Sequence, residues 1–167
     1  MGQTKEKLQE AFAGESQANR RYLAFAKKAE EEGFPGVARL FRAAAEAETI
    51  HALNHLRAMG GIGSTVENVQ AAIHGETYEF KTMYPEMIEI AEKEGETEAK
   101  QSFFFANEAE KMHAAIFERA LMYVKEGKDV PVDRLYVCPV CGYTLEGERP
   151  DKCRVCGTEG SKFIEIT

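Results

Sequence analysis

The sequence predicts an all-α four-helix bundle followed by a small metal-binding domain, on the basis of three observations. Four long segments before residue 128 have apolar residues at the spacing typical of amphipathic helices. The first two of these segments resemble the last two, so they form an internal repeat. All four cysteines lie in the last thirty residues, in a segment rich in glycine, proline and β-branched residues that has no helical period.

The overall composition is that of a globular protein, with 167 residues of which 44% are hydrophobic and 29% charged. No apolar run approaches the roughly 20 residues that a membrane span needs. The amino terminus lacks the apolar core of a signal peptide, and Glu6 stands where a myristoylation motif requires Ser or Thr. We therefore expect a cytoplasmic protein. A net charge of −7 without a basic tract argues against nucleic-acid binding.

Start and stop signals give the expected limits of the helices. A glycine directly follows each of the four, and Ser64 and Glu67 have the spacing of a capping box at the start of the third. Pro85 lies inside the third helix, where it removes a backbone hydrogen bond and is expected to kink it. The predicted helices span residues 4–32, 35–59, 65–94 and 97–126.

The internal repeat pairs the acidic and histidine residues of the two halves. The segments GESQANRRY and AEAETIHA of the first half return as GETYEFKTMY and ANEAEKMHA in the second. Equivalent residues are separated by 61 positions for Glu15 and Glu76, and by 62 for Glu48 and Glu110 and for His51 and His113. The repeat breaks at Glu79, because its counterpart is Ala18.

Carboxylates and imidazoles occupy the apolar stripes of all four helices. Burying several ionised carboxylates without partners is prohibitively costly, whereas two divalent cations neutralise them. A Glu-x-x-His motif on two helices and a Glu from each of the others is the ligand scheme of di-iron and di-manganese bundles. Redox chemistry favours iron. The alternative is that these are ordinary exposed helix residues. The predicted ligands are Glu15, Glu48, His51, Glu76, Glu79, Glu110 and His113.

Four further polar residues lie near this set. His55 is one turn beyond His51 and is either a residue at the rim of the bundle or a partner of a ligand. His74 is expected to be exposed. Tyr22 and Tyr84 are candidates to hydrogen bond the ligating carboxylates, and the alternative for both is a place in the core.

The carboxyl-terminal segment contains two Cys-x-x-Cys pairs, which predict a tetrahedral site of four thiolates. The spacing permits either zinc or iron. We expect a linker at residues 127–133, a bundle domain at 1–130 and a metal-stabilised domain at 131–167. About 34 residues bury too little apolar surface to fold without a metal. The predicted ligands are Cys138, Cys141, Cys153 and Cys156.

These motifs together resemble the rubrerythrin family over the whole chain. The resemblance rests on AGES at 13–16, Glu48-x-x-His51, GETYE at 75–79, MYP at 83–85, Glu110-x-x-His113 and the CPVCGY knuckle at 138–143. It implies a ferritin-like bundle with two irons and a rubredoxin-like domain with a third. It also implies reduction of hydrogen peroxide to water as a protection against oxidative stress. The expected electron source is NAD(P)H, through a reductase or rubredoxin.

The resemblance further implies a role for each ligand. Glu48 and Glu110 bridge the irons, Glu15 is terminal on the first, and Glu76 and His113 are terminal on the second. Glu79 and His51 are expected to alternate on the first iron. Oxidation adds positive charge to the metals, which favours the anionic Glu79 over the neutral His51.

The connection between the second and third helices is short, which predicts a dimer. Returning along the bundle from His51 to Glu76 requires roughly 27 Å of helix travel at 1.5 Å per residue. The connection from Met59 to Val66 extends to at most about 25 Å. We therefore expect the first two helices of one chain to pair with the last two of another, as in a domain-swapped homodimer. The length of the last helix also places the thiolate iron about 25 Å from its own bundle ligands, unless a neighbouring chain supplies a closer one.

Two rival functions use the same residues. One is a ferroxidase or iron-storage protein of the ferritin class, which has no need of an electron-supplying domain. The other is a non-enzymatic regulator with a zinc ribbon and a structural dimetal site.

Overall fold

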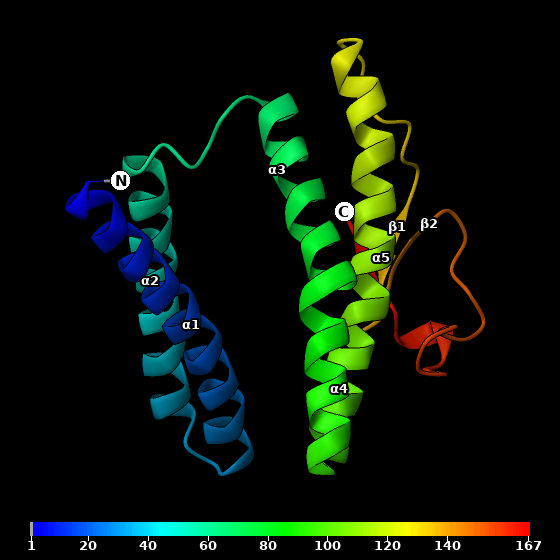
Figure 1. Cartoon of the computed structure of the whole chain (residues 1–167). Coiled ribbons are helices and arrows are strands. Elements are labelled where there is room, and N and C mark those ends of the chain that lie inside the picture. The colour runs from blue at the N-terminus through cyan, green and yellow to red at the C-terminus, as the bar shows by residue number, and fades with distance from the viewer. Residues whose placement is uncertain (1) are drawn as a thin grey trace. The chain divides into compact units, whose positions relative to one another are not determined.

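The computed structural model describes residues 2–167, which form two compact units, 1–63 and 64–167, apart from the undescribed first residue. The first unit is a helical hairpin of α1 (Gln3–Glu31) and α2 (Pro35–Ala58). The second contains α3 (Thr65–Tyr78), the π-helix η1 (Glu79–Met83), α4 (Tyr84–Glu94) and α5 (Thr97–Lys125), followed by a small β-domain (Figure 1). All four predicted helical segments are confirmed, to within two residues at each end.

The α1–α2 hairpin packs through small side chains. Ala26 and Ala29 of α1 and Ala38 and Ala45 of α2 are buried, which lets the two helices approach closely. Buried Asn19 donates from Nδ2 to the carbonyl of Ala45 at 2.7 Å and to the hydroxyl of Thr49 at 2.8 Å. These bonds satisfy both amide hydrogens of the buried side chain.

Helix α3 begins at the predicted capping box. The hydroxyl of Ser64 accepts from the backbone N–H of Glu67 at 3.4 Å, and the Glu67 carboxylate accepts from the Ser64 N–H at 2.7 Å. At the other end of the segment, Gly95 adopts the left-handed conformation with φ of 76° after α4. A residue with a side chain is strained in this conformation, so glycine ends the helix.

The segment before Pro85 is a π-helix rather than a simple kink. The N–H of Tyr84 bonds to the carbonyl of Glu79, five residues earlier. A π turn accommodates one extra residue in a continuous helix. The sequence locates the insertion, since Glu15 and Glu76 are 61 positions apart but Tyr22 and Tyr84 are 62 apart. η1 therefore holds the residue by which the second repeat is longer, and Glu79 begins it.

The carboxyl-terminal domain is a three-stranded antiparallel sheet of order β2-β1-β3. Its strands are β1 (Leu135–Val137), β2 (Thr144–Glu146) and β3 (Ile164–Ile166), with the 3₁₀ turn η2 (Gly160–Lys162) before β3. Its core is buried and contains three aromatic rings beside cysteines: Tyr136, Cys138, Cys141, Tyr143, Cys153 and Phe163.

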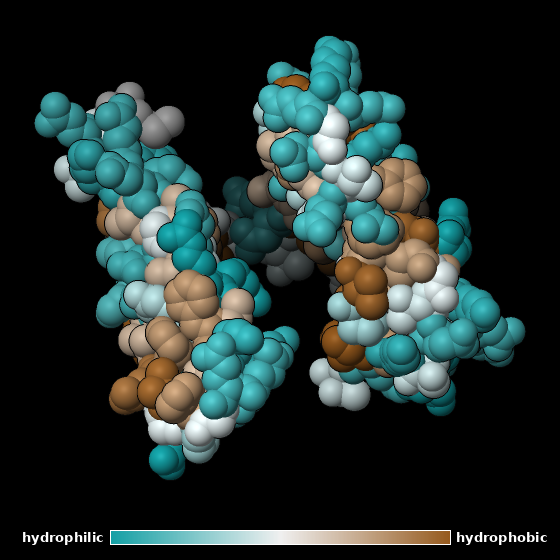
Figure 2. Space-filling view, turned by 90° about the horizontal axis from the view of Figure 1, so that it is seen from below, coloured by the Kyte–Doolittle hydropathy of each residue, from teal (hydrophilic) through white to brown (hydrophobic). Residues whose placement is uncertain are grey.

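Both units present apolar side chains on their surfaces, which Figure 2 shows as brown patches among the hydrophilic residues. In the first unit, exposed apolar residues include Phe25, Leu40 and Ile50, and in the second they include Ile90 and Phe104. Extended apolar surface of this kind is typical of faces that pack against other helices. No helix in the described residues, 2–167, is long and apolar enough to cross a membrane.

Candidate metal centres

The first unit brings Glu15 of α1 together with Glu48 and His51 of α2. Their potential ligand atoms all lie within 4.8 Å of one another. Glu48 and His51 are three residues apart and so lie on the same face of α2. Nδ1 of His51 is 3.0 Å from Oε2 of Glu48 and 3.9 Å from Oε1 of Glu15. The structure thus assembles three of the predicted ligands into one group.

The two carboxyl groups of the first unit shift each other's pKa in opposite directions. A hydrogen bond with Glu48 raises the pKa of Glu15, and partial burial and the charge of Glu48 add to the effect. The pKa of Glu48 is lowered, by hydrogen bonds from Glu15 and then from His51. Like charges this close favour one protonated and one ionised carboxyl. A cation can replace that proton.

The second unit builds the matching group from Glu76 of α3 and Glu110 and His113 of α5. These potential ligand atoms also lie within 4.8 Å of one another. Nδ1 of His113 is 2.6 Å from Oε2 of Glu110 and 3.7 Å from Oε2 of Glu76. Oε2 of Glu76 is buried and has no hydrogen-bond partner among residues 2–167. A buried oxygen without a partner indicates a missing cation or donor.

Burial perturbs this second group more strongly than the first. Desolvation raises the pKa of Glu76 to about 7, and the hydrogen bond with Glu110 and the charge of Glu110 contribute. Burial also acts to raise the pKa of Glu110, but hydrogen bonds from His113 and Glu76 outweigh it and the net shift is downward. The hydrogen bond to Glu110 raises the pKa of His113, against an opposing effect of burial.

The donor chemistry of both groups fits iron. Each supplies two carboxylates and an imidazole, which is half of the ligand scheme of di-iron bundles. In each pair the pKa of one carboxyl group is raised by the other, as expected for two carboxyl groups without a cation between them, and one buried oxygen has no donor. All six residues were predicted as ligands from the sequence, and the structure places them in two matched clusters.

Glu79 and Tyr84 lie beside the second cluster without belonging to its compact ligand group. Burial and the negative charge of Glu110 raise the pKa of Glu79. Burial, and then the charges of Glu110, Glu79 and Glu76, raise the pKa of Tyr84. These couplings place both side chains at the edge of the cluster. The Tyr84 ring also packs near Phe103, with centroids 6.4 Å apart.

The remaining predicted residues have more modest surroundings. The ring of Tyr22 lies beside Phe25 and Phe41, with centroid separations of 6.4 and 6.0 Å, and its role as a hydrogen-bond partner of the ligands stays a prediction. His55 is half-buried and close enough to Glu15 to act on the pKa of that carboxyl. His74 is exposed, as predicted.

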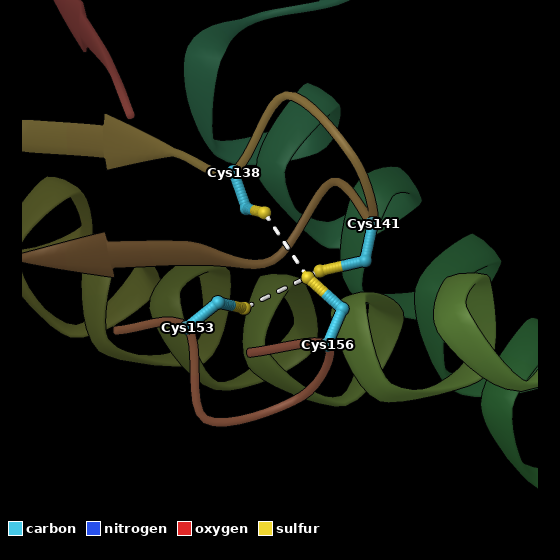
Figure 3. Close-up of side chains that lie close together, drawn as sticks. All are labelled: Cys138, Cys141, Cys153 and Cys156. Atoms are coloured by element: carbon cyan, nitrogen blue, oxygen red, sulfur yellow. Dashed lines mark hydrogen bonds between the residues drawn. The ribbon is translucent and has the colours of Figure 1, made fainter. Parts of the chain in front are cut away.

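The four cysteine sulfurs point toward one another from two knuckles (Figure 3). Sγ of Cys138 is 3.5 Å from that of Cys156, and Sγ of Cys141 is 3.5 Å from that of Cys153. These separations exceed a disulfide bond of about 2.05 Å. They approach the edge of about 3.8 Å of a tetrahedron with 2.3 Å metal–sulfur bonds. The four thiols therefore fit a tetrahedral metal ion.

The two knuckles have the same backbone hydrogen bonds. The N–H of Gly142 bonds to the carbonyl of Cys138 at 3.0 Å, and that of Gly157 to the carbonyl of Cys153 at 2.9 Å. Both glycines have positive φ, of 75° and 76°, which these tight turns require. In the second knuckle, burial acts to raise the pKa of Cys156. Hydrogen bonds from Thr158 and the neighbouring thiols outweigh burial and lower this pKa to about 6.

The net pKa shift is in the opposite direction for two other thiols. Desolvation raises the pKa of Cys141 and also that of Cys153, so these groups resist ionisation unless a cation is present. Metal binding requires the thiolate form, and the metal compensates the cost of burying it. The domain can bind the ion only when two buried thiols lose their protons, and the bound ion then stabilises the domain.

The β-domain packs beside α5 and the second carboxylate cluster. A side chain at Gly142 would contact Cβ of Ala109 at 3.9 Å, and a cavity of about 340 Å³ is lined in part by Glu110, His113 and Cys141. The expectation that the thiolate site lies a helix length from its own chain's ligands is therefore wrong. About ten extended residues after Gly127 span roughly 33 Å, enough to retrace the 25 Å of helix (Figure 1).

One contact at this interface escaped the sequence analysis. Nε2 of His113 is 2.8 Å from the hydroxyl of Thr144 in β2. Helical periodicity says nothing about which strand residue meets a helix, so the sequence contains no local signal for this pair. The π insertion did have a signal, in the change of repeat offset from 61 to 62 between Glu15 and Tyr22.

Comparisons with known proteins give the same assignment for both parts of the chain. The family model described as rubrerythrin matches residues 6–121, and the one described as rubrerythrin, rubredoxin-like domain matches residues 136–164. Rubrerythrin-2 of Clostridium acetobutylicum is 41% identical, over 93% of this chain and 92% of its own length. Nigerythrin of Nitratidesulfovibrio vulgaris is 38% identical, over 93% of this chain and 83% of its own length.

A solved structure supports the fold. The partially reduced state of nigerythrin has a TM-score of 0.58 and 34% identity, and the match covers 99% of this chain and 88% of that chain. The predicted fold class, a ferritin-like bundle with a rubredoxin-like domain, is confirmed. The division at residues 130 and 131 stays a prediction. The chain belongs to the rubrerythrin family, with a di-iron site formed by its helices and an iron site in its four-cysteine domain.

Proposed function

We propose that this protein reduces hydrogen peroxide to water with electrons delivered through its four-cysteine iron. Membership of the family makes it a di-iron oxidoreductase of oxidative-stress protection. The observation that supports the finer proposal is the packing of the Cys141 knuckle against the helix that carries Glu110 and His113. An iron-storage protein has no use for a redox centre at this position.

The proposed roles of the residues follow from their charge and position. The two irons, when bound, would supply the two electrons that, with two protons, convert peroxide to two waters. Glu48 and Glu110 would be shared between the two metals, Glu15 would hold one of them, and Glu76 and His113 would hold the other. Glu79 and His51 would exchange as ligands of the first metal when its oxidation state changes, because added positive charge favours the carboxylate.

His51 is suited to leave and return. Its side chain is 53% exposed, and its contacts within its own unit are with Glu48 and Glu15 through Nδ1. Glu79 begins a π turn, where the backbone departs from the regular ladder. The electrons originate from NAD(P)H, through a reductase or rubredoxin that reaches the exposed Val140 in the first cysteine knuckle.

A direct test uses protein reconstituted with ferrous iron without air. Thiolate-to-iron charge transfer gives oxidised protein a red colour, and reduction bleaches it. Adding peroxide to fully reduced protein is expected to restore the colour while peroxide is consumed. A Cys156→Ser variant is the matched control, since it disables the electron supply and leaves the helices intact. Reduced protein that leaves peroxide unconsumed contradicts the proposal, and iron uptake far above three ions per chain supports the storage alternative.

The proposal includes a homodimer in which the first two helices of one chain pair with the last two of the other. The supporting arguments are the short connection at 60–64 and the exposed apolar residues of both units. The three-ligand cluster of each unit is half of a di-iron site, so two units must combine to complete one.

Mixing two inactive variants tests the exchange of helices. Glu15→Ala damages the first cluster, and Glu76→Ala damages the second. In a swapped heterodimer, one site combines both damaged clusters and the other combines two intact clusters. Co-folding equal amounts of the two variants makes about half of the dimers heterodimers, so it is expected to restore about a quarter of all di-iron sites, measured by iron content and peroxide consumption. An unswapped dimer restores none, because each chain then keeps its own damaged cluster.

A further inference from the structure

The hydroxyl of Thr144 connects the four-cysteine domain to the histidine of the second carboxylate cluster. It lies 2.8 Å from Nε2 of His113 and donates to the carbonyl of Gly142 at 3.1 Å. Gly142 directly follows Cys141, whose sulfur belongs to the four-thiol group. Three hydrogen-bonding groups thus lead from a cysteine knuckle to an imidazole on α5.

The direction of these hydrogen bonds follows from counting hydrogens. A threonine hydroxyl has one hydrogen, and here the carbonyl of Gly142 accepts it. The oxygen is then left as an acceptor toward His113, so the hydrogen between them belongs to Nε2. A neutral imidazole with hydrogen on Nε2 has its free electron pair on Nδ1. Nδ1 is the nitrogen that faces Glu110 and Glu76.

We infer that Thr144 is a positioning residue for the di-iron site, which it serves by holding His113 in the tautomer that presents Nδ1 to the metal. The inference rests on the di-iron part of the proposed function and not on peroxide as the substrate. A ligating histidine commonly donates its other N–H to a nearby oxygen, which fixes the ring. Here that oxygen comes from the domain that binds the other metal.

The surroundings of Thr144 hold its hydroxyl in place. Side chains alternate across a strand, so Thr144 and Glu146 face α5 while Leu145 packs on the core of the small domain. Glu146 forms an ion pair with Arg119 of α5. On the other side, Gly142 lies against Ala109, one residue before Glu110. Contacts on both sides of Thr144 therefore fix the position of β2 along the axis of α5.

The first test compares three variants by their affinity for ferrous iron, measured without air by competition with a chelator. Thr144→Val removes the hydroxyl at nearly constant shape and is expected to weaken iron binding in the bundle by about tenfold or more. Thr144→Ser keeps the hydroxyl and is expected to bind within about threefold of the wild type. Glu146→Gln weakens only the docking ion pair and serves as the control for domain attachment.

The four-cysteine site reports on damage to the small domain. Its red charge-transfer absorption is expected to be the same in all three variants, because none of them alters a thiol. Equal iron affinity in the wild type and Thr144→Val overturns the inference. It is also overturned if Thr144→Ser binds as weakly as Thr144→Val, or if Glu146→Gln does so, since the hydroxyl is then not the cause.

The second test observes the tautomer directly. Protein labelled with ¹⁵N-histidine and loaded with zinc, a diamagnetic probe, has only four histidines to assign. Long-range ¹H–¹⁵N spectra are expected to show metal on Nδ1 and hydrogen on Nε2 of His113, and a second, broadened population in Thr144→Val. Metal on Nε2 in the wild type contradicts the inference. Failure of peroxide reduction alone leaves both tests intact, so the two proposals fail separately.

Discussion

The two carboxylate clusters share one sequence motif but differ in how firmly they hold their histidines. In the first unit, the side chain of His51 is 53% exposed and its Nδ1 lies 3.0 Å from Glu48. In the second, His113 is 29% exposed, lies 2.6 Å from Glu110 and is also bound at Nε2 by Thr144. The two copies thus carry equivalent ligands in different surroundings, with one histidine more exposed and the other contacted at both ring nitrogens.

Removing the central carboxylate of either cluster should have the largest effect. Glu48→Ala and Glu110→Ala each delete a proposed bridging ligand and leave a partner carboxyl without its hydrogen bond. We expect ferrous iron affinity in the bundle to fall by more than about 100-fold in both, since replacement of residues that merely support ligands already costs 10–100-fold. Iron analysis after desalting measures this. A variant that retains two bundle irons per chain contradicts the assignment.

Glu79→Ala should affect the reaction more than metal binding. Glu79 lies outside both compact ligand groups, so the variant is expected to retain its iron. Without a carboxylate to take the place of His51, we expect peroxide reduction to slow by roughly 10- to 100-fold. Glu79→Asp is the matched control that keeps the charge. Unchanged steady-state peroxide reduction in Glu79→Ala refutes the exchange of ligands.

The second cluster should bind metal with a stronger dependence on pH than the first. Glu76 has a pKa of about 7 in the metal-free protein, and it must lose its proton to bind a cation. Cobalt affinity at this cluster is therefore expected to fall at least about tenfold per pH unit below 7. Glu76→Gln should make this dependence shallower by one proton and leave the part due to His113, whose pKa is also raised. A pH-independent affinity in the wild type between pH 5 and 7 disproves the prediction.

The raised pKa of Glu76 also predicts how the stability of the metal-free protein changes with pH. The folded state raises the pKa of Glu76 above its ordinary value of 4.5, so it binds the proton more tightly than the unfolded state. The contribution of this group to stability is therefore full below pH 4.5 and is lost as pH rises toward 7. Denaturant titrations of wild type and Glu76→Gln at pH 5 and 7.5 measure it. The raised pKa is contradicted if the wild type gains stability relative to Glu76→Gln between pH 5 and pH 7.5.

The smallest expected effect concerns the start of the second unit. Helix α3 has a full capping box at Ser64, whereas α1 and α2 have no side-chain cap. Ser64→Ala should lower the free energy of unfolding by about 1 kcal/mol. Ser64→Asp, which retains an acceptor for the Glu67 N–H, should restore most of it. Urea denaturation compares the three proteins, and an unchanged midpoint in Ser64→Ala argues against a structural role for the cap.

Prediction from the sequence succeeded where periodic patterns and metal-ligand spacing determine the structure. Glu-x-x-His places two ligands on one helix face whatever the rest of the chain does, so Glu48 with His51 and Glu110 with His113 could be paired in advance. Two Cys-x-x-Cys knuckles likewise define a four-sulfur site. Helix ends followed from glycines and from the Ser64 cap.

Contacts between domains could not be predicted in this way. The fold-back of the small domain depends on non-local contacts, such as Gly142 with Ala109 and Arg119 with Glu146, and neither residue of such a pair indicates its partner. Estimating separation from helix length alone ignored the ability of the linker to retrace α5. The role of Tyr22 stays a prediction, because the packing of its ring beside Phe25 and Phe41 does not determine what its hydroxyl binds.

The π turn at η1 explains how the two copies of the repeat can differ in length and still have equivalent packing. An added codon in a helix ordinarily rotates every later residue by about 100° and so destroys the packing downstream. Here the extra residue is absorbed within Glu79–Met83, and Tyr84 and Gly95 keep the same offset from their counterparts Tyr22 and Gly33. The second copy can therefore carry a carboxylate at Glu79, where the first has Ala18, while the residues after η1 stay in register with the first copy.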